Sequence, residues 1–416
     1  MKTQGLFISL LLAVLMVMPS GAWAQEDEGF YTVYGVVKDA RSKRDLENVS
    51  VSVPGSSVGT VTNADGEFSL KIRNSLRAFH IDLSHIGYVN SRVAVKGEAG
   101  ERLTIALIPD PTLLEELVVR GGDARPLVEE AMKRVATNYS PDNILHTGFY
   151  RETVKKGRNY INISEAILDV YKTSYTYDAD YDRVQVLKGR QLLSPRASDT
   201  LVVKLQGGPN LSVFLDFVKN PNLVLDQETL YHYKFSYDKQ EMIDGRAHFA
   251  VRFAPQVIVP YTLMQGIMYI DKDNLSFSRI EFEMSMDDQN KVTQSILRKK
   301  PFGLRFKPER VSYVVTYKQR DGRSYLNYIR NNVEFKCDWR RRLFATNYSI
   351  QSEMVVTESQ LDNVEKIPAK LAFRPSYSLS DKVSDFSDPN FWEDYNIIEP
   401  TESLEDAVSK LKKRYR

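Results

Sequence analysis

The chain is almost without cysteine, because its 416 residues include only Cys337. A lone cysteine cannot form an internal disulfide, so the fold must depend on the size of its hydrophobic core and not on covalent cross-links. Cys337 lies in a predicted strand at residues 332–339. We expect a packed thiol there and not a reactive one.

Histidine is also scarce, and none of the five forms a His-Glu-x-x-His motif or another metal-binding spacing. The sequence lacks a Gly-x-Ser-x-Gly elbow and a phosphate-binding loop as well. Asp287-Asp288 lacks the Gly and terminal Glu of a calcium loop, and we expect a solvated turn. We therefore predict a protein that is not an enzyme, with no catalytic residue, no cofactor and no metal site. The histidines are His80, His85, His146, His232 and His248.

The only long apolar run lies at the N-terminus, at residues 6–18. Lys2 precedes this run and Ala22-Trp23-Ala24 follows it, which is the order of a secretory signal peptide over residues 1–24. We expect cleavage after Ala24, and an uncleaved anchor is the alternative. No cysteine follows the cleavage site to carry a lipid. The mature chain has no run of ~20 apolar residues, so no membrane helix is predicted in it.

Neither sign of charge predominates, since 56 Lys and Arg residues face 54 Asp and Glu residues for a net charge of +2. This balance gives no reason to propose nucleic-acid binding. Aromatic residues reach 11%, and flat rings pack well on the pleated surface of a sheet. A hydrophobic content of 42% is enough for real cores and argues against disorder.

Residues 31–108 contain seven short predicted strands separated by turn signals. Asn63-Ala64-Asp65-Gly66 is a tight turn, in which Gly66 supplies a positive φ at little cost. Strands of this length and spacing are typical of a β-sandwich. The expected strands cover residues 31–38, 49–53, 57–62, 67–72, 78–85, 91–95 and 103–107.

Four segments, residues 33–39 (VYGVVKD), 46–51 (LENVSV), 59–70 (GTVTNADGEFSL) and 86–88 (IGY), resemble in order and spacing the carboxypeptidase-regulatory-like domain. This module precedes many Bacteroidetes outer-membrane receptors and surface proteins. The resemblance implies a transthyretin-like sandwich without catalytic residues. Asn63 stands where the family often has Asp, and its side chain can make the same turn.

Beyond a linker at residues 109–124, a helix is expected to begin at Arg125-Pro126, since proline suits the first turn of a helix. Long strands joined by short turns follow, and a short helix is expected at residues 211–218. The pattern predicts an antiparallel sheet that is either open or curled into half a barrel. The strands are expected at residues 148–155, 159–171, 231–238, 247–254, 265–270, 276–284, 310–317, 324–335 and 343–356.

Residues 149–152 (FYRE), followed by 164–166 (SEA), resemble an uncharacterised Bacteroidetes family of outer-membrane-associated proteins, in which the sandwich module precedes this region. Residues 388–400 (DPNFWEDYNIIEP) are similar to the closing motif of the same family. Residues 266–271 are more distantly similar to periplasmic lipoprotein carriers of the Lol type. That second resemblance implies a curved sheet around an apolar ligand.

The end of the chain carries three bulky aromatic residues close together, Phe391, Trp392 and Tyr395. We expect them to anchor residues 371–400 against the large domain, because a solvated tether gains nothing from such side chains. The alternative is a disordered arm that folds only on a partner. A surface helix is expected after Ser403. Its apolar face would consist of Leu404, Ala407, Val408 and Leu411.

Two surface clusters leave their role open. Basic residues at 298–300, 305–307 and 340–342 either meet anionic lipid head groups or form solvated hairpin ends. Four evenly spaced tyrosines would lie on one face of an extended strand, as a glycan-binding surface or as ordinary packing. These tyrosines are Tyr171, Tyr175, Tyr177 and Tyr181.

Together these features predict an exported, mainly β protein. Its expected parts are a signal peptide (1–24), a seven-stranded sandwich (31–108), a linker (109–124), an antiparallel β-rich domain (125–370) and a packed tail with a helix (371–416). We expect a non-enzymatic binding or scaffolding protein of the bacterial envelope, in the periplasm, at the outer membrane or on the cell surface. Its partner would be an outer-membrane or surface protein, or an envelope lipid. The alternatives are a carrier of a lipid or other apolar ligand in the curved sheet, and a hydrolase.

Overall fold

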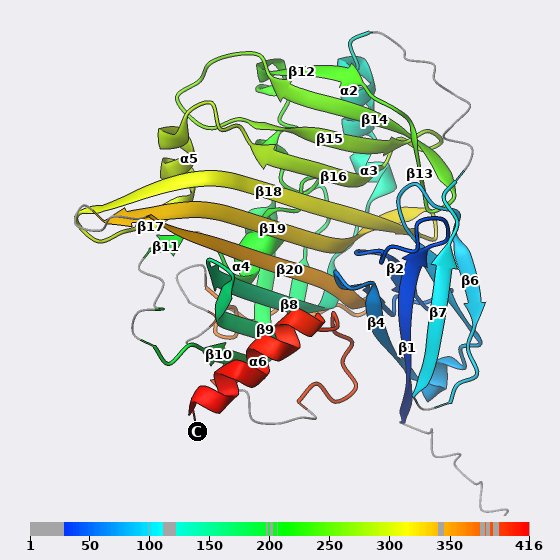
Figure 1. Cartoon of the computed structure of the whole chain (residues 1–416). Helices are drawn as coiled ribbons and strands as arrows, with labels where there is room; N and C mark the ends of the chain where they lie inside the picture. Colours follow the sequence, from blue (N-terminus) through cyan, green and yellow to red (C-terminus); the bar gives the residue numbers. More distant parts are fainter. Residues whose placement is uncertain are drawn as a thin grey trace, which may run out of the picture.

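The structure, a computed structural model, describes residues 29–98, 100–110, 122–196, 199, 203–205, 207–339, 345–374, 379, 383–385 and 391–415. The predicted signal peptide, most of the predicted linker and the basic residues 340–342 lie outside this part of the chain. The fold is mainly β, as the sequence predicts, with a small sandwich beside a much larger sheet (Figure 1). In the described part of the chain, no helix is both long and apolar enough to cross a membrane.

The seven predicted strands of the sandwich are confirmed. They form one sheet in the order β4-β1-β7 and a second in the order β3-β2-β5-β6. Alternate side chains such as Val33, Val37, Leu70 and Ile81 are completely buried between the two sheets, because successive residues of a strand point to opposite faces. The strands are β1 (Phe30–Asp39), β2 (Ser50–Ser52), β3 (Gly59–Val61), β4 (Glu67–Arg73), β5 (His80–Ser84), β6 (Ser91–Ala94) and β7 (Glu101–Leu107).

The predicted turn at residues 63–66 is also confirmed. The Asn63 side-chain oxygen accepts hydrogen bonds from the backbone N–H groups of Asp65 and Glu67, each at 2.9 Å. Gly66 has a φ of +74°, and a Cβ there would lie only 2.6 Å from the Val37 carbonyl oxygen. The Asn63 side chain therefore makes this turn, and position 66 requires glycine.

The large sheet contains twelve described strands and does not close into a barrel. Eleven of them follow the order β12-β14-β15-β16-β18-β19-β20-β8-β9-β10-β21, and β13 pairs with β14. The strands are β8 (Ile144–Lys156), β9 (Asn159–Lys172), β10 (Arg183–Leu193), β12 (Tyr233–Tyr237), β13 (Glu241–Ile243), β14 (Arg246–Pro255), β15 (Met264–Asp271), β16 (Phe277–Met284), β18 (Leu304–Arg320), β19 (Arg323–Trp339), β20 (Thr346–Gln360) and β21 (Ser384–Asp385).

One face of this sheet is covered by helices and loops that join it in a single core (Figure 1). Val128 of α2 and Val213 of α4 are buried with strand residues such as Met268 and Ile280. The helices on this face are α2 (Arg125–Lys133), α3 (Val135–Asn138), α4 (Pro209–Phe214) and α5 (Gln289–Ile296), whereas α6 (Glu402–Tyr415) lies on the opposite face (Figure 1). Shorter pieces are β11 (Lys204–Leu205), β17 (Leu297–Lys299), η1 (Asn74–Leu76), η3 (Ala179–Tyr181), η5 (Pro221–Leu223) and η6 (Leu230–His232).

The central strands are buried on both faces. Tyr150 and Met354 face the core under the helices, whereas their neighbours Phe149 and Val355 belong to a second core on the opposite face. Phe391 and Trp392 complete this second core, so the predicted anchoring of the tail is confirmed for its described residues. The predicted helix follows as α6, and its side chains Leu404, Val408 and Leu411 pack on β9 and β10.

One local prediction is wrong. The four tyrosines do not share one strand, because β9 ends at Lys172, where the Asp182 carboxylate accepts hydrogen bonds from the Thr173 N–H and hydroxyl. Tyr175 is buried, while Tyr177 and Tyr181 are 60% and 57% exposed. Asp287-Asp288 lies in a turn as expected, with Asp287 exposed, and the turn leads into α5, because the Asp288 side chain accepts from the N–H groups of Asn290 and Lys291 and caps the helix.

Candidate functional site: the junction of sandwich, sheet and tail

The sandwich is attached directly to the face of the large sheet. Arg330 of β19 pairs with Glu47 at 2.6 Å, and Arg73 of β4 makes two hydrogen bonds of 3.0 Å to the Glu358 carboxylate of β20. Ser57 bonds the Ser359 backbone in both directions, as donor to the carbonyl and acceptor from the N–H. The junction thus joins residues about three hundred positions apart in the sequence.

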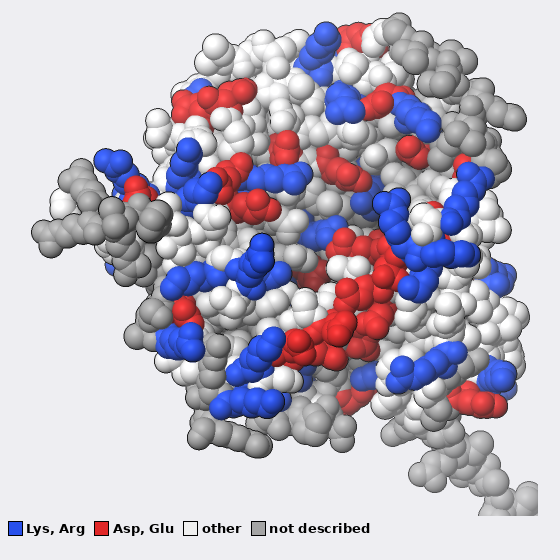
Figure 2. Space-filling view, viewed as in Figure 1, with Lys and Arg blue, Asp and Glu red and all other residues white. Residues whose placement is uncertain are grey.

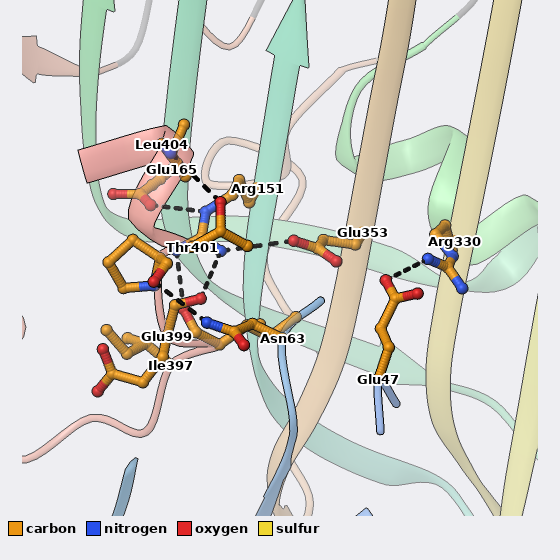
Figure 3. Close-up of polar contacts among 12 residues, drawn as sticks. Glu47, Asn63, Arg151, Glu165, Arg330, Glu353, Ile397, Glu399, Thr401 and Leu404 are labelled. Carbon is orange, nitrogen blue, oxygen red and sulfur yellow. Dashed lines mark hydrogen bonds and ion pairs between the residues drawn. The ribbon is translucent and has the colours of Figure 1, made fainter. Parts of the chain in front are cut away.

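The tail lies between the sandwich and the sheet and bonds to both. The Thr60 hydroxyl donates to the Ile397 carbonyl at 2.8 Å. The side-chain amide of Asn63, labelled in Figure 3, donates to the Pro400 carbonyl at 3.1 Å. The side-chain amide of Asn396 accepts a hydrogen bond from the Lys71 N–H and donates one to the Lys71 carbonyl, as the backbone of a neighbouring strand would. These contacts fix the tail along the edge of the sandwich.

Arg151 of β8 holds the tail from the side of the sheet. Its guanidinium donates to the Glu165 carboxylate and to the Ile398 carbonyl, each at 2.8 Å, and to the Glu399 carbonyl at 3.3 Å (Figure 3). The side chain is 5% exposed. Burial opposes its charge, but Glu165 and Glu353 outweigh this effect and raise the pKa of Arg151. Burial also opposes the charge of Glu165, but Arg151 and Arg190 of β10 outweigh this effect and lower the pKa of that carboxyl.

Aromatic packing around Trp392 also holds the tail, and we call these contacts together with those of Arg151 the clamp. Trp392 meets Phe149 edge to face, with ring centroids 5.4 Å apart, and the Arg190 guanidinium lies 4.7 Å from the centroid of the indole. Val61 of the sandwich belongs to the same buried cluster. One apolar core is therefore shared by the sandwich, the sheet and the tail.

Two segments that lie far apart in the sequence meet in this core. The first, at residues 149–152 and 164–166, supplies Phe149, Arg151 and Glu165, and the second, at residues 388–400, supplies Trp392 and the carbonyl groups that Arg151 binds. The sequence identified both segments but did not pair them, because neither contains a signal for the other.

A cleft of about 670 Å³ opens beside the junction, between the sandwich loop at residues 52–57 and the end of β18. Hydroxyl and amide groups provide much of its lining, and Tyr325 contributes an aromatic ring. The hydroxyl and amide residues are Ser50, Ser52, Ser56, Ser57, Ser84, Ser91, Ser359, Asn90, Asn327 and Gln319. Such a lining suits a polar ligand.

Cations outnumber carboxylates in this cleft, with Arg92, Arg246, Lys318 and Arg320 against Asp82 and Asp244. Arg92 is held by Asp82 at 2.7 Å and Arg246 by Asp271 at 2.8 Å. Lys318 and Arg320 lie on the same face of β18, because they are two residues apart. Lys318 donates to the Ser52 hydroxyl, and burial lowers its pKa while Asp244 and Asp82 oppose that change. The excess positive charge favours an anionic group on the ligand.

A second charged cluster lies deep in the core. The Lys172 ammonium contacts Asp182 at 2.8 Å and Asp216 at 2.9 Å, and Asp216 also accepts from the hydroxyls of Tyr175 and Tyr317. Burial opposes the charge of Lys172, but the two carboxylates outweigh it and raise the pKa. Because these groups are fully enclosed, the cluster ties the loops to the sheet and offers no access to a ligand.

His80 and His85, both in the sandwich, differ in their surroundings. His80 is exposed, whereas His85 stacks edge to face on Tyr88 and bonds only backbone carbonyls. Among the described residues, no three His, Cys, Asp or Glu side chains are grouped to hold a metal ion. Cys337 is packed as predicted, and burial raises its pKa to about 11. The cleft was not predicted, because strands far apart in the sequence supply its lining.

Residues 33–119 match the family model of the CarboxypepD_reg-like domain, which confirms the resemblance seen in the sequence. The chain has no match among curated proteins. Solved structures with some likeness include a DUF1329 family protein from Desulfovibrio piger (11% identity, 59% of this chain and 96% of that chain, TM-score 0.24). Others are a protein from Bacteroides fragilis described as membrane-associated and of unknown function (12%, 79% and 98%, 0.16) and MucB in complex with MucA(peri) (10%, 58% and 100%, 0.18). TM-scores this low support no argument about fold or function.

Proposed function

We propose that this protein is a non-enzymatic binding protein of the bacterial cell envelope, associated with the outer membrane. In this proposal the sandwich is a rigid docking module, and the cleft beside it binds a polar ligand that carries an anionic group. The sandwich (31–108) and the sheet domain (125–370) act as one body, because the tail (371–416) clamps them together.

The observation that carries the proposal is the composition of the cleft. Hydrogen bonds from Ser57 and Arg73 to β20 hold the sandwich beside the sheet, so the cleft is preformed and a ligand would lose little free energy in ordering it. Lys318 and Arg320 provide charge, and the surrounding hydroxyl groups provide hydrogen bonds. A site of this kind can recognise a charged group and a pattern of hydroxyl groups beside apolar surface.

The alternative of an apolar carrier needs a large cavity lined by apolar side chains against the sheet. The helix-covered face is instead filled by residues such as Phe217, Phe253 and Phe282, whose rings pack 5.1 to 6.2 Å apart. This packing favours the binding protein over the carrier.

One pair of residues keeps the hydrolase as a second candidate. Ser52 and Lys318 are hydrogen-bonded in the cleft, and a neutral lysine can act as base to a serine nucleophile. Burial lowers the pKa of Lys318 and favours this neutral form, and Asp244 and Asp82 only partly oppose that change, so the pair keeps the hydrolase as the second candidate.

The test is native mass spectrometry of the protein purified from envelope fractions. We expect a bound acidic, non-protein species that is retained by wild type and by Lys370→Met, a control at an exposed residue away from the cleft, and is lost in Lys318→Met. Equal retention by Lys318→Met, or no bound species, would contradict the proposal. Labelling of Ser52 by a fluorophosphonate, abolished in Ser52→Ala, would favour the hydrolase instead.

A further inference from the structure

The end of the large sheet where β17 leads into β18 presents an apolar side chain to solvent. Phe302 is 99% exposed, at the tip of a turn that Gly303 makes with a φ of +81°. The Lys300 ammonium donates to the Leu304 carbonyl at 2.6 Å, which braces the turn from within. The phenylalanine is therefore held away from the body of the protein on a short, supported projection.

Cations surround this tip. Residues 297–308 contain no carboxylate, and their five cationic side chains are exposed. The nearest acid across the ladder is Asp338, which is in register with Arg305 and partly buried. Glu309 lies just beyond and is paired with Lys336 at 2.5 Å. The five cations are Arg298, Lys299, Lys300, Arg305 and Lys307.

A second exposed apolar residue lies at the same end of the sheet. Ile258, which is 96% exposed, belongs to the loop between β14 and β15. This loop is tied to α5 by a hydrogen bond of 2.6 Å from the Lys291 ammonium to the Val259 carbonyl, and α5 leads directly into β17. Figure 1 places α5 and β17 together at the left end of the sheet, and Figure 2 shows blue side chains there.

We propose that this end of the sheet docks on the surface of an anionic phospholipid bilayer. Phe302 and Ile258 insert among the head groups, and the five cations face the lipid phosphates. The surface of a bilayer can accommodate a single projecting aromatic ring, whereas a protein partner would need a pocket of matching shape. Aromatic and apolar side chains next to Lys and Arg are the usual composition of such interfacial contacts, and each cation near an anionic surface contributes attraction. This inference does not depend on the ligand of the cleft.

Co-sedimentation of the mature full-length protein with vesicles tests the inference. One set of vesicles contains phosphatidylcholine alone, and the other contains phosphatidylcholine with phosphatidylglycerol. The variants are Phe302→Ser and Lys299→Glu/Lys307→Glu, which leaves the Lys300 brace of the turn intact. Their matched controls are Phe79→Ser, which removes a 71% exposed ring from the sandwich, and Lys370→Glu, which reverses an exposed charge elsewhere.

We expect wild type and both controls to bind the anionic vesicles, with binding that weakens as salt is raised. The double charge reversal should weaken binding about tenfold or more, since each cation near an anionic surface contributes about 1 kcal/mol. Phe302→Ser should also bind more weakly than Phe79→Ser. The inference is overturned if wild type fails to bind the anionic vesicles or binds both vesicle types equally. It is also overturned if the two tip variants bind the anionic vesicles as strongly as wild type.

Discussion

Replacing Arg151 with methionine tests the clamp at its centre. The substitution keeps much of the apolar stem but removes the donors to Glu165 and to the carbonyl groups of Ile398 and Glu399. Removing one partner of a buried ion pair costs about 3–5 kcal/mol of stability. Glu165 keeps Arg190 at 2.8 Å, so we expect a loss near the lower end, about 3 kcal/mol.

The assay is urea unfolding, combined with hydrogen exchange of the tail amides at residues 391–404. Arg310→Met is the matched control, because Arg310 pairs with Glu283 at 3.2 Å on an exposed surface, where a pair contributes at most about 1 kcal/mol. Arg151→Met should lose the larger stability and show faster exchange in the tail. A loss no greater than that of the control, with unchanged exchange in the tail, would refute the clamp.

Three other predictions address the core, the response to acid and processing. Trp392→Ala should cost about 3–5 kcal/mol in thermal or urea unfolding, whereas Tyr181→Ala, at a 57% exposed ring, should cost about 0.5 kcal/mol or less; equal effects would favour a tail that binds a partner. Burial lowers the pKa of His146 to about 3 in the folded protein. As the pH falls below 6.5, the usual pKa of histidine, this side chain therefore takes up a proton in the unfolded chain but stays neutral in the folded protein. Stability is therefore lost as the pH falls, by about 2 kcal/mol between pH 7 and pH 5, and His146→Gln should flatten this slope; a slope equal to that of wild type would count against the burial argument. Intact-mass measurement of exported protein should show Gln25 as the first residue, and retained residues 1–24 or an attached lipid would disprove the predicted cleavage.

The sandwich and most hairpins could be predicted because their signals are local. Alternation at Val49, Val51 and Val53 and the turn that ends at Gly66 each depend on a few neighbouring residues. The helix α6 was predicted for the same reason, since Leu404 and Leu411 recur at helical spacing. Local patterns of this kind survive folding when tertiary contacts agree with them.

Predictions failed where distant residues decide the structure. Strand β10 was not predicted, because its solvent-facing and core-facing residues alternate irregularly around a bulge between Val186 and Lys188. The strand before Tyr175 ends because Asp182, ten residues away from Lys172, binds Thr173 and Lys172. The cleft depends on Ser52 and Lys318, which lie 266 positions apart, and no spacing rule connects them.

The central claim is that the sandwich and the sheet form one rigid body closed by the tail. The most direct measurement is the distribution of distances between spin labels at Glu98→Cys on the sandwich and Lys234→Cys on β12, both exposed, in a Cys337→Ala background. We predict a single narrow distribution that broadens when Trp392→Ala is added. A broad distribution without that substitution, or one that Trp392→Ala leaves unchanged, would contradict the claim.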